Sequence, residues 1–112
     1  MLLEDKTRHQ QICKYMTDLW ERKNRDYGNS FSKSFEEFGT VMCAIRLEDK
    51  LNRFKNLIKN NQCVTDESIR DTLIDLANYS IMTVMELDKK AESERTVGFD
   101  SLQVNMFDGA NE

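Results

Sequence analysis

The chain has 112 residues, of which 39% are hydrophobic and 32% charged, and it contains no proline. This length fits one domain, and the absence of the strongest helix breaker favours long helices over a turn-rich β fold. The net charge of −4 argues against nonspecific binding to duplex nucleic acid, because such binding depends on clustered lysine and arginine. We therefore expect a single all-α domain that does not bind duplex nucleic acid.

The cysteines and the hydrophobic segments indicate a cytoplasmic protein. Cys13, Cys43 and Cys63 are odd in number and widely spaced, as is typical of reduced thiols. Cys43 lies in the hydrophobic segment 41–45, so we expect it to be buried. No signal-peptide pattern and no hydrophobic run of about 18 residues is visible, so the sequence predicts no association with a membrane.

The first half of the chain predicts one long and one short helix. Residues 3–24 carry hydrophobic side chains at helical spacing, and the turn-forming residues of segment 26–30 follow. A short helix is expected next, with Ser34 as a possible N-cap, and Gly39 would end it or open the following helix. The hydrophobic face of the first helix consists of Ile12, Tyr15, Met16, Leu19 and Trp20.

The second half predicts two further long helices, over residues 40–59 and from Thr65 or Asp66 to about Lys89. The expected core stripe of the 40–59 helix consists of Ala44, Leu47, Leu51, Phe54 and Ile58.

The last helix has two hydrophobic faces. Leu73, Leu76, Val84 and Leu87 lie on one of them, together with Ile69, Ala77 and Ser80, and the other carries Ile74, Ile81 and Met85. A helix that is hydrophobic on two sides needs two packing partners. We therefore expect an antiparallel bundle of about four helices that assembles as a homo-oligomer, a dimer or higher.

The hydrophobic pattern ends near residue 90. We take residues 1–92 as a single helical domain and residues 93–112 as a C-terminal tail that is flexible or docked on a neighbouring subunit.

Acidic residues on two helices suggest a magnesium site. Asp71 and Asp75 lie one helical turn apart, so both carboxylates can reach one hard cation, and Asp49 on the antiparallel neighbouring helix could supply a third oxygen ligand. Magnesium suits such a site because it needs few protein ligands and takes others from water and from substrate phosphates. Asp49, Asp71 and Asp75 are therefore the expected catalytic and metal-binding residues.

Basic and amide side chains beside these acids suggest a polyphosphate ligand. The residues expected to neutralise phosphate charge are Lys23, Arg25, Arg46, Lys50 and Arg53. Asn78, Tyr79 and Met82 share or flank the acidic face of the last helix, a mixture that favours a half-buried pocket. A simpler interpretation remains, since acid–base neighbours at i, i+3 and i+4 are common on solvated helix faces.

Three stretches of the sequence resemble a known family. They are KNRDYGNS at residues 23–30, the segment 46–53 with its Asp49-Lys50 pair, and the segment 67–82, which ends in NYSIM. Together they resemble the phage and bacterial family of nucleotide-modification-associated domain 1 proteins. That family is similar to the all-α nucleoside triphosphate pyrophosphohydrolases, the group of MazG and the dimeric dUTPases.

The resemblance implies a magnesium site built from two acid pairs, Glu-x-x-Glu on one helix and Glu-x-x-Asp on its antiparallel neighbour. Asp49 and Asp75 match the last acid of each pair. The first acids are missing, because Arg46 stands three residues before Asp49 and Thr72 stands three before Asp75. Asp71 could compensate on the second helix, and on the first helix the candidate is Glu48, which we include among the expected metal ligands.

Two functions and one structural role stay open. The resemblance implies a magnesium-dependent enzyme that hydrolyses a nucleoside triphosphate to monophosphate and pyrophosphate. Such an enzyme would act in phage-related nucleotide metabolism. The alternative is a protein that binds or sequesters a nucleotide or nucleotide-derived signal without cleaving it, with Asn78, Tyr79 and Tyr27 around the base or ribose. The third is a helical assembly module with solvated charged faces.

Overall fold

The computed structural model describes residues 2–60 and 66–97 and contains four helices in that part of the chain. They are α1 (Asp5–Tyr27), α2 (Ser30–Phe38), α3 (Thr40–Lys59) and α4 (Asp66–Val97). The expected all-α class is confirmed. The last helix was predicted to end near Lys89 but continues to Val97, and most residues of segment 90–95 are good helix formers (Lys90, Ala91, Glu92, Glu94 and Arg95).

Two short junctions join the first three helices. Gly28 caps α1 in the left-handed conformation at φ 60°, and Asn29 follows at φ 63°. These are the residue types that adopt this conformation at least cost. Ser34 was considered as an N-cap, but α2 already begins at Ser30, so Ser34 lies inside that helix. Gly39, with φ 70°, separates α2 from α3 as expected.

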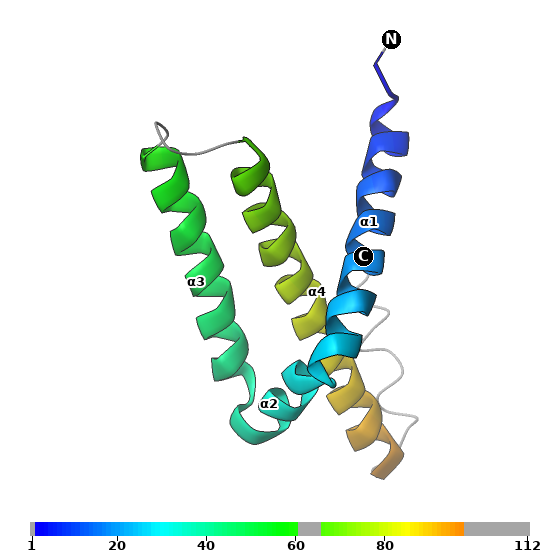
Figure 1. Cartoon of the computed structure of the whole chain (residues 1–112). Coiled ribbons are helices and arrows are strands. Elements are labelled where there is room, and N and C mark those ends of the chain that lie inside the picture. The colour runs from blue at the N-terminus through cyan, green and yellow to red at the C-terminus, as the bar shows by residue number, and fades with distance from the viewer. Residues whose placement is uncertain (1, 61–65, 98–112) are drawn as a thin grey trace.

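The helices are arranged around α4 (Figure 1). α3 and α4 form an antiparallel hairpin, and α1 lies along the opposite side of α4 with its N-terminal half diverging from it. α2 connects α1 to α3 across one end of this arrangement. The Arg70 guanidinium stacks over the Tyr15 ring, 5.3 Å from its centroid, and this contact ties α1 to α4.

The hydrophobic core is small. Its buried members in the described residues are Met16, Met42, Cys43 and Ile74. Cys43, at 2% exposure, is buried as predicted.

The stripe expected to form the core of α3 is only partly buried. Leu47 and Phe54 are half-buried, but Ala44, Leu51 and Ile58 are exposed. The prediction was wrong for these three residues, because α3 turns the side carrying Met42 and Cys43 inward instead.

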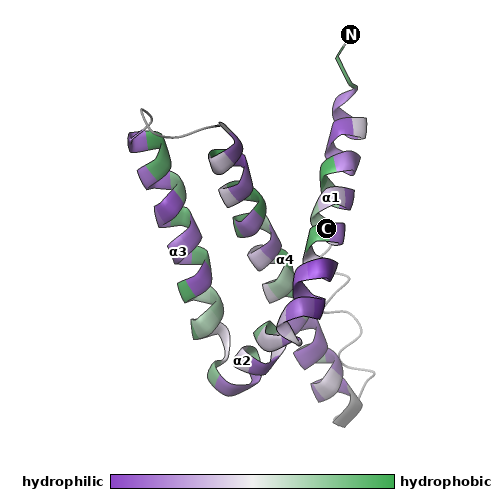
Figure 2. Cartoon of the chain, in the orientation of Figure 1, coloured by the Kyte–Doolittle hydropathy of each residue, from purple (hydrophilic) through white to green (hydrophobic). Residues whose placement is uncertain are grey.

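Large hydrophobic side chains remain exposed on several helices. In Figure 2 hydrophobic and hydrophilic positions are interspersed along α3 and α4. The exposed hydrophobic residues of these two helices are Val41, Ile45, Leu51, Ile58, Leu73, Ile81, Val84 and Leu87. None of the helices in the described ranges combines the length and the hydrophobicity needed to cross a membrane.

Candidate functional site

All four helices contribute to one pocket of about 270 Å³. Two of its sides come from α1 and α4, and α2 and α3 close it with fewer residues. The lining consists of Trp20, Lys23, Asn24, Tyr27, Ser30, Phe31, Lys50, Asp75, Asn78, Tyr79 and Met82. We refer to this feature as the four-helix pocket.

Helical spacing explains the contribution of α1. Trp20, Lys23, Asn24 and Tyr27 stand at i, i+3, i+4 and i+7, which places them on one side of the helix. α1 ends directly after Tyr27 because Gly28 takes the left-handed conformation. The turn at Gly28 and Asn29 then brings α2, with Phe31, back to the pocket.

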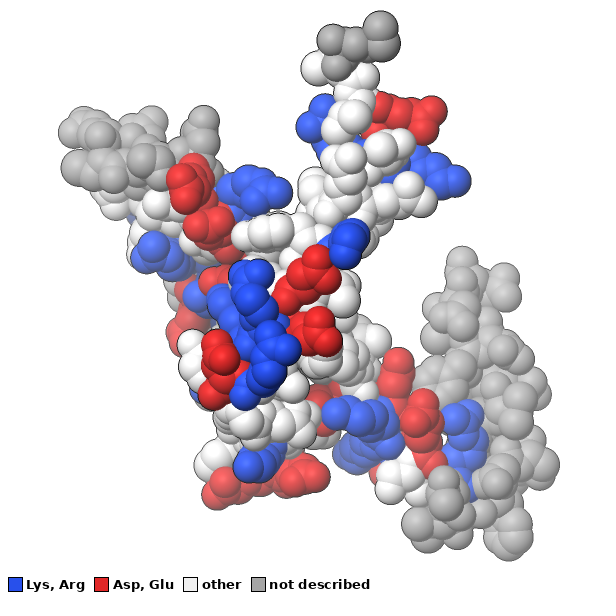
Figure 3. Space-filling view, turned by 45° about the vertical axis from the view of Figure 1, so that its right-hand side comes forward, with Lys and Arg blue, Asp and Glu red and all other residues white. Residues whose placement is uncertain are grey.

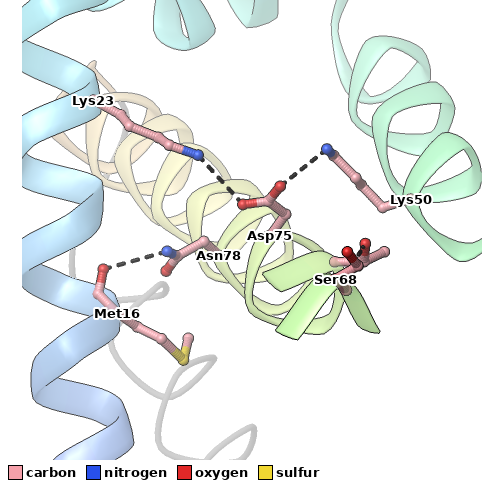
Figure 4. A network of polar contacts seen from close by, with 7 residues as sticks. Met16, Lys23, Lys50, Ser68, Asp75 and Asn78 are labelled. Atoms are coloured by element: carbon pink, nitrogen blue, oxygen red, sulfur yellow. Dashed lines mark hydrogen bonds and ion pairs between the residues drawn. The ribbon is translucent and has the colours of Figure 1, made fainter. Parts of the chain in front are cut away.

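Asp75 is the centre of the charged part of the pocket. Lys50 donates to its Oδ2 at 3.0 Å and Lys23 donates to its Oδ1 at 3.4 Å, so each carboxylate oxygen receives one lysine (Figure 4). The two lysines come from α3 and α1, on either side of α4. Lys50 and Asp75 are partly buried, whereas Lys23 is half exposed.

This arrangement leaves an excess of positive charge. Two ammonium groups share one carboxylate, so the group carries a net charge of about +1 beside a partly enclosed pocket. An ammonium group has three donors, so each lysine can hold Asp75 and still donate to a phosphate. The space-filling view shows lysine and arginine side chains gathered near the middle of one face, with acidic side chains around them (Figure 3).

Aromatic rings form the other part of the pocket. Phe31 and Tyr79 contact each other with ring centroids 5.9 Å apart and planes tilted by 30°. Trp20 and Tyr27 also line the pocket. Flat π faces of this kind stack on nucleobases, and such stacking contributes about 1–3 kcal/mol per base in single-strand-binding proteins.

Amide groups complete the lining. Asn78 donates from Nδ2 to the backbone carbonyl of Met16 at 3.3 Å, and this bond fixes its orientation between α4 and α1 (Figure 4). Asn24 lines the pocket from α1. Amide side chains supply both donors and acceptors, as recognition of a base or ribose requires.

A second polar cluster holds α2 in place. Glu86 is 7% exposed and accepts hydrogen bonds from Ser32 and from Lys89, the latter at 2.8 Å. Because Ser32 follows Phe31 directly, this cluster fixes the helix that carries one of the pocket aromatics. Its members are buried or paired within the chain, so we assign them a structural role.

The pocket gathers only some of the residues singled out in the sequence. It brings together Lys23, Tyr27, Lys50, Asp75, Asn78 and Tyr79. The expected half-buried pocket beside Asn78, Tyr79 and Met82 is confirmed. The other candidates are exposed and do not line it: Arg25, Arg46, Glu48, Asp49, Arg53 and Asp71.

In the part of the chain that the structure describes, acidic side chains do not converge on a metal-sized site. Within the described ranges, no three histidine, cysteine, aspartate or glutamate residues lie close enough to hold a metal ion. Asp75 instead makes two ion pairs with lysines. Magnesium binding by Asp49, Asp71 and Asp75, with Glu48, stays a prediction.

Thr72 occupies the place where the resemblance expects an acid. It is buried, and its hydroxyl donates to the backbone carbonyl of Ser68 at 2.9 Å. Its side chain is therefore occupied within its own helix.

Several pocket residues were not assigned to the site from the sequence. Trp20 was assigned to the hydrophobic face of the first helix, and Asn24, Ser30 and Phe31 were given no ligand role. The signal that could have identified them is the i, i+3, i+4, i+7 series of Trp20, Lys23, Asn24 and Tyr27, which mixes aromatic, basic and amide side chains on one helix face.

Comparison with protein-family models gives a match over residues 23–87 to the family described as nucleotide modification associated domain 1. The matched segment contains every pocket residue except Trp20. Comparison with curated proteins and with solved structures finds no significant match. Since the family model covers more than half of the 112 residues, this chain belongs to the nucleotide modification associated domain 1 family.

Proposed function

We propose that the chain binds a nucleotide in the four-helix pocket. The observation that carries this proposal is the position of Lys23 and Lys50, which converge from two helices on Asp75 beside an aromatic-lined cavity. The lysines bind the phosphate, and Trp20, Tyr27, Phe31 and Tyr79 surround the base. Membership of a nucleotide-associated family supports the same ligand class.

Asp75 has a positioning role in this proposal. Without it, two ammonium groups in a partly buried site would repel each other and turn toward solvent. With it, both lysines are held at the pocket before the ligand arrives, so less side-chain entropy is lost on binding. The residue thus contributes to affinity although its own charge opposes an anionic ligand.

Nucleotide capture without cleavage is the function that the geometry supports best. The phosphate-binding charges and the aromatic surface are already assembled within one chain. The carboxylates required for a multi-metal reaction are not, since Asp49 and Asp71 are exposed outside the pocket. A protein that binds a nucleotide without cleaving it needs the charges and the aromatic surface but not the carboxylates.

Magnesium-dependent hydrolysis of a nucleoside triphosphate to monophosphate and pyrophosphate is the second candidate. One observation favours it: Asp75 already lies at the pocket, and Asp71 is one helical turn before it on α4. Asp71 and Asp75 would hold the magnesium, and for this Lys23 or Lys50 would have to release Asp75. Bound magnesium would supply charge stabilisation at the phosphates and acidify a water.

One experiment separates the two candidates. Purified protein is titrated with nucleoside mono-, di- and triphosphates by calorimetry, with and without Mg²⁺, and the same mixtures are followed by phosphorus NMR. We expect saturable binding of at least one nucleotide, which is recovered intact. Release of pyrophosphate only in the presence of Mg²⁺ would establish the hydrolase instead, and absence of binding across the whole panel would contradict both.

A further inference from the structure

The outward face of α4 is hydrophobic, and its large side chains remain exposed among the residues that the structure describes. Residues of α4 that line the four-helix pocket, such as Asp75 and Asn78, lie on the inward side. At about 100° per residue, Leu73, Ser80 and Val84 point to the opposite side. Leu73, Val84 and Leu87 are 40%, 54% and 43% exposed. A helical layer with a hydrophobic outer face is stable only when that face packs against another element.

The outward residues follow a coiled-coil repeat. Leu73, Ala77, Ser80, Val84, Leu87 and Ala91 are spaced 4, 3, 4, 3 and 4, and Arg70 and Glu94 extend the same seam by one position at each end. We call these eight residues the α4 seam. This spacing is typical of a helix that packs lengthwise against a second helix.

From this seam we infer that a second copy of the chain packs on the outer face of α4, with the two α4 helices antiparallel and related by a two-fold axis at the level of residue 82. In this register Leu73 faces Ala91 of the second copy, Ala77 faces Leu87, and Ser80 faces Val84. Every hydrophobic layer then joins a large and a small side chain, which is how facing positions interdigitate. The interface is isologous, as a two-fold axis requires.

Charge selects the same register. The antiparallel pairing centred on residue 82 places Arg70 opposite Glu94 of the second copy at both ends of the seam. The Arg70 guanidinium lies over the Tyr15 ring of its own chain, and the N–H groups at its edge still allow it to pair with that carboxylate. A parallel pairing would place Arg70 against Arg70 and Glu94 against Glu94, which is unfavourable. If the two-fold axis moves 3.5 residues toward the N-terminus of α4, Arg70 faces Leu87 instead of Glu94.

Ser80, the uncharged polar residue of the seam, can be buried without losing its hydrogen bond. The Ser80 hydroxyl donates to the carbonyl of Leu76 at 3.1 Å within its own helix. Its burial between two helices therefore leaves no unsatisfied donor. Ser80 and Ala77 are also small, which allows the two helices to approach closely.

The inferred dimer does not block the four-helix pocket. The pocket lies on the inward side of α4 and the seam on its outer side, so each copy keeps one open pocket. Dimer formation and nucleotide binding are accordingly separate properties, and either can fail without the other.

Cysteine cross-linking tests the register. Ala77→Cys and Leu87→Cys are prepared in chains whose Cys13 and Cys63 are replaced by serine, and are oxidised alone and as a mixture. In the inferred register residue 77 faces residue 87 of the second copy, so it lies ten residues, or about 15 Å along the helix axis, from residue 77 of that copy. The same holds for residue 87. A disulfide joins Cα atoms only about 4.4–6.8 Å apart, so neither variant should cross-link to itself. We expect disulfide-linked dimers in the mixture, at least tenfold more than with either variant alone.

Two outcomes overturn the inference. Self-cross-linking of either variant at the level of the mixture would indicate parallel or unspecific pairing. Light scattering that shows the parent chain as a 13.2 kDa monomer at micromolar concentration would remove the dimer altogether.

A pair of charge substitutions tests the location of the interface. Val84→Asp places a carboxylate in the seam, and Val41→Asp places one on α3, at a position that is 65% exposed in the single chain. Both changes are on exposed residues, so both variants should keep the helix content of the parent. We expect Val84→Asp to weaken the dimer at least a hundredfold and Val41→Asp to leave it unchanged. The reverse result would place the interface on α3 and contradict the inference.

Discussion

The inward and outward faces of α4 carry different kinds of side chain. The inward face carries Asp75, Asn78 and the buried Glu86, and the outward face carries Leu73, Val84 and Leu87. In an ordinary amphipathic helix the hydrophobic side would face the core. Under the proposed function the inward face holds a polar ligand, and under the inferred dimer the outward face packs on a second copy.

Adjacent residues on the two faces should respond very differently to truncation. Ile74 is 7% exposed and belongs to the small core, while Leu73 is 40% exposed. We expect Ile74→Ala to lower the free energy of unfolding by about 2–4 kcal/mol, as for other buried large-to-small changes, and Leu73→Ala to lower it by less than about 1 kcal/mol when the protein is dilute. Chemical denaturation at two protein concentrations measures both values.

The dilution step matters because of the inferred dimer. The effect of Leu73→Ala should grow with protein concentration, whereas that of Ile74→Ala should not. If both variants lose the same free energy of unfolding at low concentration, the two faces of α4 are equally buried in the single chain. That result would contradict the difference between the faces.

A charge change in the pocket should act on affinity more than on folding. Lys50→Met removes a partly buried ammonium group that pairs with Asp75 at 3.0 Å. We expect nucleotide affinity to fall by about 1.5–3 kcal/mol, the range for hydrogen bonds to charged groups. Calorimetric titration measures the change.

Lys14→Met is the matched control for this variant. Lys14 also forms an ion pair, with Asp18 at 3.2 Å, but on an exposed part of α1 outside the pocket. Its substitution should leave affinity unchanged. An equal effect of both substitutions would indicate that only net charge matters, and Lys50 would lose its role as a phosphate ligand.

The smallest effect is expected for the exposed arginines of α3. Arg46 and Arg53 were proposed from spacing as phosphate ligands, but both are exposed and neither lines the pocket. Arg46→Lys and Arg53→Lys should therefore change nucleotide affinity by less than about 0.5 kcal/mol. A loss of about 1 kcal/mol or more in either variant would extend the binding surface from the pocket onto the outer side of α3.

The sequence predicted the fold class because hydrophobic periodicity is a local property. The bounds of α3 and the role of Gly39 as a junction followed from that pattern. Three boundaries were placed wrongly for local reasons as well: the end of α1, the start of α2 and the end of α4. The charged end of α4 has no hydrophobic period to reveal it, and the left-handed residues Gly28 and Asn29 make a tighter turn than their polar surroundings suggested.

The site was predictable only where one helix face carried the signal. Asp75, Asn78 and Tyr79 share the inward side of α4, and the sequence pointed to them together. Which basic residues would join them was not predictable from spacing, because that depends on how α1 and α3 are rotated about their axes. Lys50 turns inward and Arg53, three residues later, does not.

The most direct test of nucleotide binding uses Trp20. It is the only tryptophan in the sequence and it lines the four-helix pocket, so its fluorescence reports on that pocket alone. We expect a saturable change in Trp20 emission on titration with a nucleotide, with the same midpoint as the calorimetric curve and a shift to higher concentration in Lys50→Met. Calorimetric binding that leaves Trp20 emission unchanged would place the nucleotide elsewhere and contradict the account.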